Sequence, residues 1–388
     1  MAPSDPILGV TEAFVADRNP KKVNLGVGVY YDDDGRIPLL ECVRHAESER
    51  LKSSPHRGYL PIDGLAAYDK AVQGLVFGTE DRRIVTVQAL GGTGGLKIGA
   101  DFLRRVAPSA EVWISEPSWE NHRQIFEAAG FTVKSYAYYD PATKGLDFEG
   151  MRRALSALPA GTIVVLHACC HNPTGVDLSQ EQWNTVLELV RARSLVPFLD
   201  FAYQGFGDGL EADAYAARLF TGAMTPVFLA SSFSKSFSLY GERVGALSVV
   251  TASPDEAARV LSNLKRVVRA TYSNPPTHGC EIVATVLTNP QLRALWEREL
   301  GAMRERIKAM RKRLVENIQA RVPGGDFAFM LRQRGMFSYS GLAKDQVRRL
   351  REESSIYAID TGRICVAALN TKNVDYVADA IAKVVAPL

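Results

Sequence analysis

The stretch Val227-Phe-Leu-Ala-Ser-Ser-Phe-Ser-Lys235 joins a short apolar run to a polar end that carries a lysine. An apolar run without alternation is typical of a strand that is buried on both faces of a sheet. In mostly parallel sheets, ligands bind outside the carboxyl ends of the strands. We therefore expect Lys235 to lie at the edge of a binding site.

The same pattern recurs through the middle of the chain. Each apolar run is followed by a polar or glycine-rich segment and then by helical periodicity, as over residues 96–106 and 180–193. This alternation predicts an α/β fold with a mostly parallel central sheet flanked by helices. The other apolar runs are residues 84–87, 112–114, 163–166 and 197–199.

The end of the chain has a different pattern. We expect a long charged helix over residues 292–319 and shorter helices over 343–352 and 374–385. Short strands are expected near residues 327–331, 337–339 and 364–367. This predicts a smaller α+β domain, residues 301–388, beside a large domain, residues 39–300. Residues 1–38 would form an N-terminal arm and part of the small domain.

The composition is that of an average soluble globular protein, with 46% apolar and 23% charged residues. The net charge of +3, from 46 basic and 43 acidic residues, predicts no nucleic-acid partner. No apolar run approaches the roughly 20 residues that span a bilayer, so we expect no membrane partner. The start resembles no secretory signal and the five cysteines include no CxxC pair, which favours a cytoplasmic enzyme.

Several groups near Lys235 are suited to bind a phosphate. Ser232 and Ser234 supply hydroxyls, and Arg243 supplies a forked cation. The glycine-rich segment 90–95 predicts a turn that opens a helix, whose free N–H groups favour an anion. A partly desolvated lysine near a cation loses its proton more easily, as a Schiff-base lysine requires. Taken alone, however, the lysine is more typical of a surface group and the glycines of a simple turn.

Asp200 ends another apolar run, and Tyr203 follows three residues later. A carboxylate in this position is costly unless it is paired, and a protonated pyridine nitrogen would pair it. The alternative is a helix N-cap, where aspartate is favoured. Asn172 follows a third apolar run and could donate to a phenolate oxygen. Trp119 could stack on a flat ring, although a core tryptophan is the default interpretation.

His167 and His171, with two cysteines between them, also suggest a metal site. They follow a strand, and no second cluster completes a tetrahedral ligand set, so we expect no metal. Arg363 and Arg269 are candidates for binding carboxylates, since each charge-assisted pair contributes roughly 1.5–3 kcal/mol. Either arginine taken alone is more typical of the surface.

Five segments, in this order along the chain, closely resemble the class I aspartate and aromatic aminotransferases. The resemblance runs from Asp5 to Asn370 and depends on the joint order of the segments. The segments are His171-Asn-Pro-Thr-Gly175, Asp200-Phe-Ala-Tyr203-Gln-Gly-Phe206, Ser232-Phe-Ser-Lys235, Gly241-Glu-Arg243-Val-Gly245 and Tyr272-Ser-Asn-Pro-Pro276.

The resemblance implies a pyridoxal 5′-phosphate (PLP) enzyme of fold type I that forms a homodimer with shared active sites. Lys235, Asp200 and Tyr203 would be catalytic, with Lys235 holding the cofactor as a Schiff base. Asp200, supported by His122, would pair with the pyridine nitrogen. The other implied cofactor-binding residues are Gly92, Thr93, Trp119, Asn172, Tyr203, Ser232, Ser234, Arg243 and, from the second subunit, Tyr59. The implied substrate-binding residues are Gly28, Trp119, Asn172, Arg363 and, from the second subunit, Arg269.

The implied reaction moves an amino group from an L-amino acid to a 2-oxo acid such as 2-oxoglutarate. Tyr31 and Ile37 resemble the aromatic branch of the family, whereas Val29, Thr93 and Asn274 resemble the aspartate branch. The residues of longer segments resemble the aromatic branch more closely. We therefore expect tyrosine and phenylalanine to be at least as good amino donors as aspartate. The alternatives are an aspartate aminotransferase proper, a β-eliminating lyase, a non-catalytic binding protein on this fold, and a nucleotide-dependent oxidoreductase.

Overall fold

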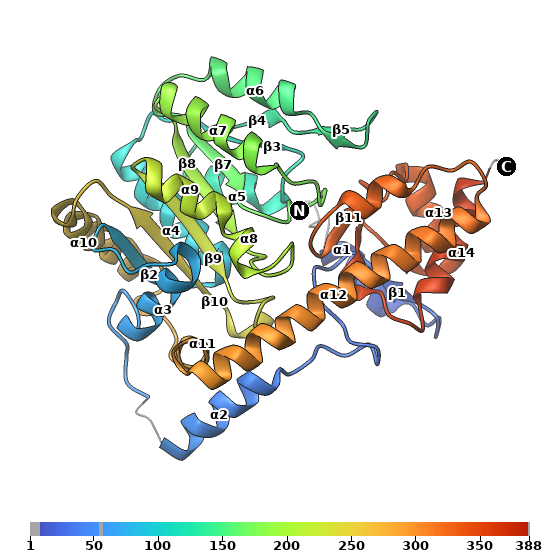
Figure 1. The fold of residues 1–388 in the computed structure, drawn as a ribbon, viewed down its shortest axis with the longest axis horizontal. Helices are drawn as coiled ribbons and strands as arrows, with labels where there is room; N and C mark the ends of the chain where they lie inside the picture. The colour runs from blue at the N-terminus through green and yellow to red at the C-terminus, as the bar shows by residue number, and fades with distance from the viewer. Residues whose placement is uncertain (1–7, 54–56, 387–388) are drawn as a thin grey trace.

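The computed structural model describes residues 8–53 and 57–386, and its centre is a seven-stranded sheet (Figure 1). Strand β10 runs antiparallel to both of its neighbours, and all other neighbouring strands are parallel. The prediction of a mostly parallel sheet is therefore confirmed. In spatial order the strands are β2 (Ile84–Leu90), β10 (Val244–Val250), β9 (Val227–Ser232), β8 (Val196–Phe201), β7 (Ile163–His167), β3 (Val112–Glu116) and β4 (Val133–Ala137).

Helices cover both faces of this sheet, because successive strand residues point to opposite sides. Phe198 packs into one hydrophobic cluster and its neighbour Leu199 into the other. The Phe198 cluster includes α4 (Gly91–Val106), α5 (Glu120–Ala128) and α10 (Pro254–Thr271). The Leu199 cluster includes α3 (Ala66–Phe77), α6 (Phe148–Ala157), α7 (Gln180–Ala192) and α9 (Tyr215–Ala223). The loops around the sheet carry β5 (Tyr139–Asp140), β6 (Gly145–Leu146), α8 (Leu210–Asp213) and the 3₁₀ turn η1 (Tyr240–Glu242).

The helix α12 (Pro290–Arg321) joins the sheet region to a second group of elements. Figure 1 shows it running from beside α2 (Glu41–Ser53) and α11 (His278–Thr288) to the C-terminal elements. In this second group β1 (Val23–Asn24) pairs in parallel with β12 (Ile356–Tyr357), so N-terminal and C-terminal residues lie side by side. The group also contains α1 (Leu8–Ala16), η2 (Ala328–Arg332), β11 (Phe337–Tyr339), α13 (Lys344–Ser354), β13 (Arg363–Cys365), η3 (Val366–Ala368) and α14 (Val374–Val385).

The domain boundaries stay a prediction, and the boundary at residue 300 would fall inside α12. The first seven residues of the expected arm lie outside the described residues. Within the described ranges, no helix has both the length and the apolar character needed to cross a membrane.

Two local expectations were wrong. The segment near 327–331 is the 3₁₀ turn η2 rather than a strand, because it packs Phe329 and Met330 into the core. A short apolar run does not distinguish these conformations by periodicity. The last strand ends at Cys365 and continues as η3. The glycine-rich segment after β2 does open a helix, and it forms the first turn of α4, which begins at Gly91.

Phe198 tests the core beneath the site. Its ring is fully buried between Phe126 and Phe228. We expect Phe198→Ala to lower the free energy of unfolding by about 3–5 kcal/mol, because it leaves a cavity that the packed helices cannot fill. Chemical denaturation followed by circular dichroism measures this change. The exposed Val106 provides the control, since Val106→Ala should change the free energy of unfolding by less than about 0.5 kcal/mol.

Candidate active site

A cavity of about 560 Å³ lies at the carboxyl ends of the central parallel strands. Its walls come from the ends of β8 and β9, the first turn of α4, and the N-terminal segment around Gly28. The structure therefore brings together residues that are more than 200 positions apart in the sequence. The predicted residues that line the cavity are Gly28, Gly92, Thr93, Trp119, Asn172, Asp200, Tyr203, Ser232, Ser234, Lys235 and Arg243.

Lys235 lies in the turn that follows β9, and its Nζ is 4.9 Å from the centre of the Tyr203 ring. Burial lowers the pKa of this amine to about 8, since the charged form loses solvation. The carboxylate of Asp200 opposes this shift, and the guanidinium of Arg243 adds to it. Lys235 can therefore shed its proton near neutral pH and act as a nucleophile or a base.

A group of donors beside Lys235 can hold a phosphate. The Arg243 Nη1 donates to Ser234 Oγ at 3.2 Å, and the Ser232 hydroxyl donates to the same oxygen at 3.2 Å. Gly91 opens α4 with a positive φ of 68°, and a Cβ there would lie 2.4 Å from Arg243 Nη2. Only glycine lets the guanidinium approach the helix N-terminus so closely. The two serine hydroxyls, the Arg243 guanidinium and the free N–H groups at the start of α4 therefore lie around a space that suits an anion.

Asp200 lies inside β8, where it pairs in register with His167 of β7. It is therefore not a helix N-cap, which corrects that alternative. The Asp200 Oδ2 is 2.9 Å from His122 Nε2, and Ser118 Oγ is 2.9 Å from the other ring nitrogen of His122. Burial alone would raise the pKa of Asp200. The hydrogen bond and charge of His122, together with Lys235, outweigh burial, so this pKa lies below its ordinary value.

The two histidines of the metal hypothesis have separate surroundings. His171 bonds Ser115 and Thr174 through its two ring nitrogens. His167 is buried, and within the described residues neither of its ring nitrogens has a hydrogen-bond partner. Possible ligand atoms of His167, His122 and Asp200 lie within 4.8 Å of one another. The Asp200–His122 hydrogen bond accounts for most of this closeness, so the cluster gives no reason to invoke a metal.

Arg363 is 1% exposed and lies beside the cavity on β13. Its Nη1 donates to Asn172 Oδ1 at 3.2 Å and its Nη2 to the carbonyl of Gly26 at 2.5 Å. Its Nε is buried and has no partner among the described residues. The guanidinium stacks over the Phe337 ring at 4.5 Å. A Cβ at Gly28 would lie 2.6 Å from Phe337 Cζ, which explains the glycine there.

Comparisons with known proteins agree with this geometry. Residues 20–381 match the family model described as aminotransferase class I and II. The chain belongs to this family. It is a PLP-dependent aminotransferase.

Three similar proteins cover almost the whole chain. An aspartate aminotransferase of Pseudomonas aeruginosa is 61% identical over 99% of this chain and 98% of its own length. An aromatic-amino-acid aminotransferase of Escherichia coli is 51% identical over 98% of this chain and 97% of its own length. A solved aromatic-amino-acid aminotransferase of Burkholderia pseudomallei, covalently bound to pyridoxal phosphate, is 64% identical. It has a TM-score of 0.97 and covers 100% of this chain and 98% of its own.

Two predicted aminotransferase residues point away from the cavity of their own chain. Tyr59 is 94% exposed, and Arg269 is exposed at the end of α10. Arg269 donates to Ser273, and the neighbouring Asn274 Nδ2 donates to the carbonyl of Leu60 at 2.8 Å. The segments that carry Tyr59 and Arg269 are therefore tied together on one surface.

Some residues near the cavity were not singled out from the sequence. Tyr240, Val27 and Ala202 line the cavity, and Phe337 supports Arg363. Tyr240 comes directly before the segment Gly241–Gly245, and this position was the only available signal for it. Tyr31, one of the residues that resemble the aromatic branch, lines a different cavity. Ile37, the other such residue, is 47% exposed.

The depressed pKa of Lys235 can be measured on cofactor-free protein. We expect brief acetylation of this amine to rise with pH around a midpoint near 8, below the ordinary lysine value of 10.5. Asp200→Asn should lower the midpoint, because it removes the charge that favours the protonated amine. Arg243→Gln should raise it. Mass spectrometry of the Lys235 peptide, with surface lysine peptides as the reference, gives each midpoint. An unperturbed midpoint near 10 would contradict this account.

Proposed function

We propose that this chain transfers amino groups between aromatic or dicarboxylic L-amino acids and 2-oxoglutarate, yielding the 2-oxo acid and L-glutamate. The observation that carries the proposal is the buried Arg363, which has a free Nε and bonds a residue of the Lys235 cavity. A buried guanidinium with an unused N–H is suited to an anionic oxygen, since bidentate pairs of this kind are strong. The α-carboxylate of an amino acid supplies that oxygen.

The cavity residues have complementary roles in holding the cofactor. Asp200, held by His122, would pair with the protonated ring nitrogen of PLP. Tyr203 and Asn172 would bond the ring oxygen, and Trp119 would stack on the ring. When bound, PLP supplies an electron-withdrawing ring that stabilises negative charge at the substrate α-carbon. The phosphate-binding residues are Gly92, Thr93, Ser232, Ser234, Arg243 and, from a second copy of the chain, Tyr59.

Lys235 moves the proton that transamination requires. Its pKa of about 8 leaves part of the amine uncharged near neutral pH, and an uncharged Nζ can accept the proton from the substrate α-carbon. The same Nζ then donates this proton when the amino group is handed on. Asp200 and Arg243 act on the pKa of Lys235 in opposite directions, so their balance sets the fraction of the amine that is ready to act.

The working unit in this proposal is a cytoplasmic homodimer. Tyr59 and Arg269 are exposed in a single chain, and the Asn274–Leu60 hydrogen bond holds their segments together. This arrangement suits residues that reach into the active site of a neighbouring copy. Arg269 would face the distal carboxylate of a dicarboxylic substrate, and Gly28 would close over the substrate from the N-terminal segment.

An aromatic donor is favoured by the apolar part of the cavity wall. Val27, Val29 and Trp119 line the cavity together with Asn172, which bonds Arg363. Apolar walls add burial for a phenyl ring at about 25 cal/mol per Å². The relatives named for aromatic substrates support the same preference. The similarity to an aspartate aminotransferase favours a second candidate, an enzyme that prefers aspartate.

Steady-state kinetics with four donors separates these candidates. We expect kcat/KM for tyrosine and phenylalanine to equal or exceed that for aspartate, with glutamate also accepted, because the apolar wall binds the ring. All four donors are measured with their matching 2-oxo acids at a fixed enzyme concentration. A preference for aspartate over phenylalanine of more than about a thousandfold would discard the aromatic assignment and leave transamination intact.

If each active site contains residues of both chains, two different inactive variants should restore turnover when they form a mixed dimer. Lys235→Ala alone should abolish turnover, and Arg269→Gln alone should strongly lower turnover of aspartate. In a dimer of one Lys235→Ala chain and one Arg269→Gln chain, one active site carries both substitutions and the other active site carries neither. Random mixing of equal amounts should therefore restore about a quarter of the wild-type rate with aspartate.

The rescue is measured after co-expression of the two chains with different affinity tags. Co-expression of Lys235→Ala with Asp200→Asn is the matched control, since both substitutions fall on the same cavity. That pair should give almost no rescue, because each active site of the mixed dimer then carries one of the two substitutions. Equal rescue by both pairs, or by neither, would argue against a composite site.

A further inference from the structure

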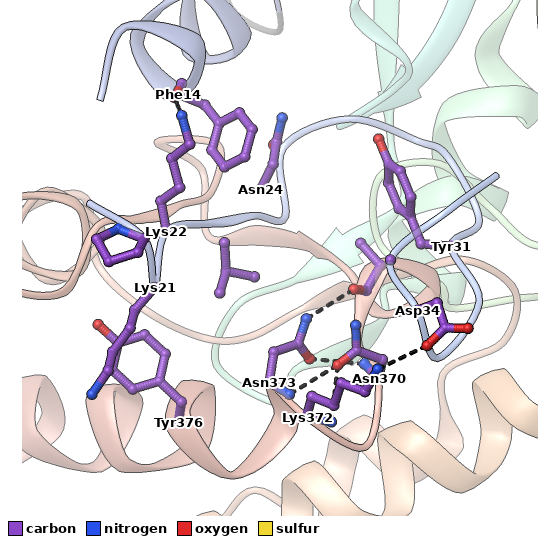
Figure 2. Close-up of a pocket in the computed structure, with 14 residues that line it drawn as sticks. Phe14, Lys21, Lys22, Asn24, Tyr31, Asp34, Asn370, Lys372, Asn373 and Tyr376 are labelled. Carbon is purple, nitrogen blue, oxygen red and sulfur yellow. Dashed lines mark hydrogen bonds and ion pairs between the residues drawn. The ribbon is translucent and has the colours of Figure 1, made fainter. Parts of the chain in front are cut away.

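A second cavity, of about 780 Å³, lies among the small-sheet elements and is larger than the cavity around Lys235 (Figure 2). Its walls come from the end of α1, the strand β1, the turn at Asp34 and the segment 368–376 that leads into α14. Small-molecule sites commonly occupy about 300–1,000 Å³ and combine apolar walls with a few placed polar groups. None of the groups assigned to the reaction lines this second cavity.

The second cavity has an excess of positive charge. Lys21, Lys22 and Lys372 line it together with a single aspartate, Asp34. Lys372 Nζ is 2.8 Å from Asp34, and Lys22 donates to backbone carbonyls at the end of α1, including that of Phe14 at 2.8 Å. Lys21 Nζ forms no hydrogen bond or ion pair within the described residues. The electrostatic balance of the cavity therefore favours an anion.

Asn370 supplies a placed donor on the floor of this cavity. It is 8% exposed, and its Oδ1 accepts from the backbone N–H groups of Lys372 and Asn373 at 3.0 and 2.9 Å. This fixes the amide, so the Nδ2 is held on the other side (Figure 2). Among the described residues, no acceptor is bonded to this Nδ2. The oriented N–H is therefore free to donate to a ligand that enters the cavity, or to water.

The remaining walls are largely apolar and aromatic. Phe14, Val23, Tyr31 and Tyr376 line the cavity, and Figure 2 labels the three aromatic rings. Aromatic rings favour other rings through edge and offset contacts, and they offer little to a bare inorganic anion. The walls therefore suit the body of an organic acid, while Lys21 and Asn370 are the groups that remain for its charged end.

We propose that this second cavity binds a small aromatic carboxylate. The carboxylate accepts from Asn370 Nδ2 and is attracted by the unpaired Lys21, and the ring lies against Phe14 and Val23. This site is separate from the Arg363 site and does not depend on which amino donor the enzyme prefers.

The test locates a heavy-atom probe in crystals of the PLP-bound enzyme. Crystals soaked in 4-bromophenylacetate should give an anomalous bromine peak beside Phe14 and Val23. A separate peak near Arg363 would report the proposed substrate site, so the two proposals succeed or fail independently. A bromine peak only at Arg363, or the second cavity filled by a neighbouring subunit in the dimer, would overturn the second site.

Solution binding excludes occupancy that occurs only at the soaking concentration. Isothermal titration with phenylacetate should give two sites per chain in the wild type and one in Asn370→Asp. This variant keeps the Oδ1 acceptor but replaces the N–H donor with a negative oxygen, so affinity at the second cavity should fall at least about tenfold. Asn184→Asp on α7, which is exposed and adds the same charge elsewhere, is the matched control and should keep both sites.

Lys21→Gln gives an independent reading if Asn370→Asp fails to fold. It removes only an exposed charge and should weaken the second phenylacetate site several-fold while leaving the first unchanged. Unchanged phenylacetate binding in both Asn370→Asp and Lys21→Gln, or loss of a site in Asn184→Asp, contradicts the proposal. Inorganic phosphate that competes as strongly as phenylacetate contradicts the aromatic part of it.

Discussion

A carboxylate buried in a central strand requires compensation from its neighbours, and Asp200 imposes this requirement on the whole active site. Its partners come from two directions: His122 from α5 and Lys235 from the turn after β9. Their combined effect keeps the pKa of Asp200 below its ordinary value despite burial. A negative charge is thereby fixed at the bottom of the cavity before any ligand enters.

This fixed charge also shapes the reactivity of Lys235. Burial and the charge of Arg243 lower the pKa of Lys235, whereas the charge of Asp200 raises it. A ligand with a positive end facing Asp200 and an anionic end facing Arg243 would weaken both influences together. The cavity is therefore matched to a molecule with two separated charges of opposite sign, and PLP with a protonated ring nitrogen is such a molecule.

The sequence could predict the central sheet and most of the cavity because both depend on local patterns. Apolar runs without alternation predict buried parallel strands, and a parallel sheet gathers its strand ends at one edge. Lys235, Asp200 and Asn172 were therefore expected to meet, and they do line one cavity. Contacts between residues that are far apart in the sequence produce no such local pattern. Neither the Arg363–Asn172 bond nor the stacking of Phe337 under Arg363 could be inferred, since packing in three dimensions creates them.

The N-terminal segment 24–31 shows why the resemblance alone did not place every residue. Val27, Gly28 and Val29 line the Lys235 cavity, whereas Asn24 and Tyr31 line the second cavity. Tyr31 therefore belongs to the wall of the second cavity and not to the wall of the Lys235 cavity. Arg363 holds the same segment through the Gly26 carbonyl, and its Nε has no partner in the described part of the chain. A carboxylate that bound this Nε would share the guanidinium with the segment, and its binding would then be linked to the position of Gly28.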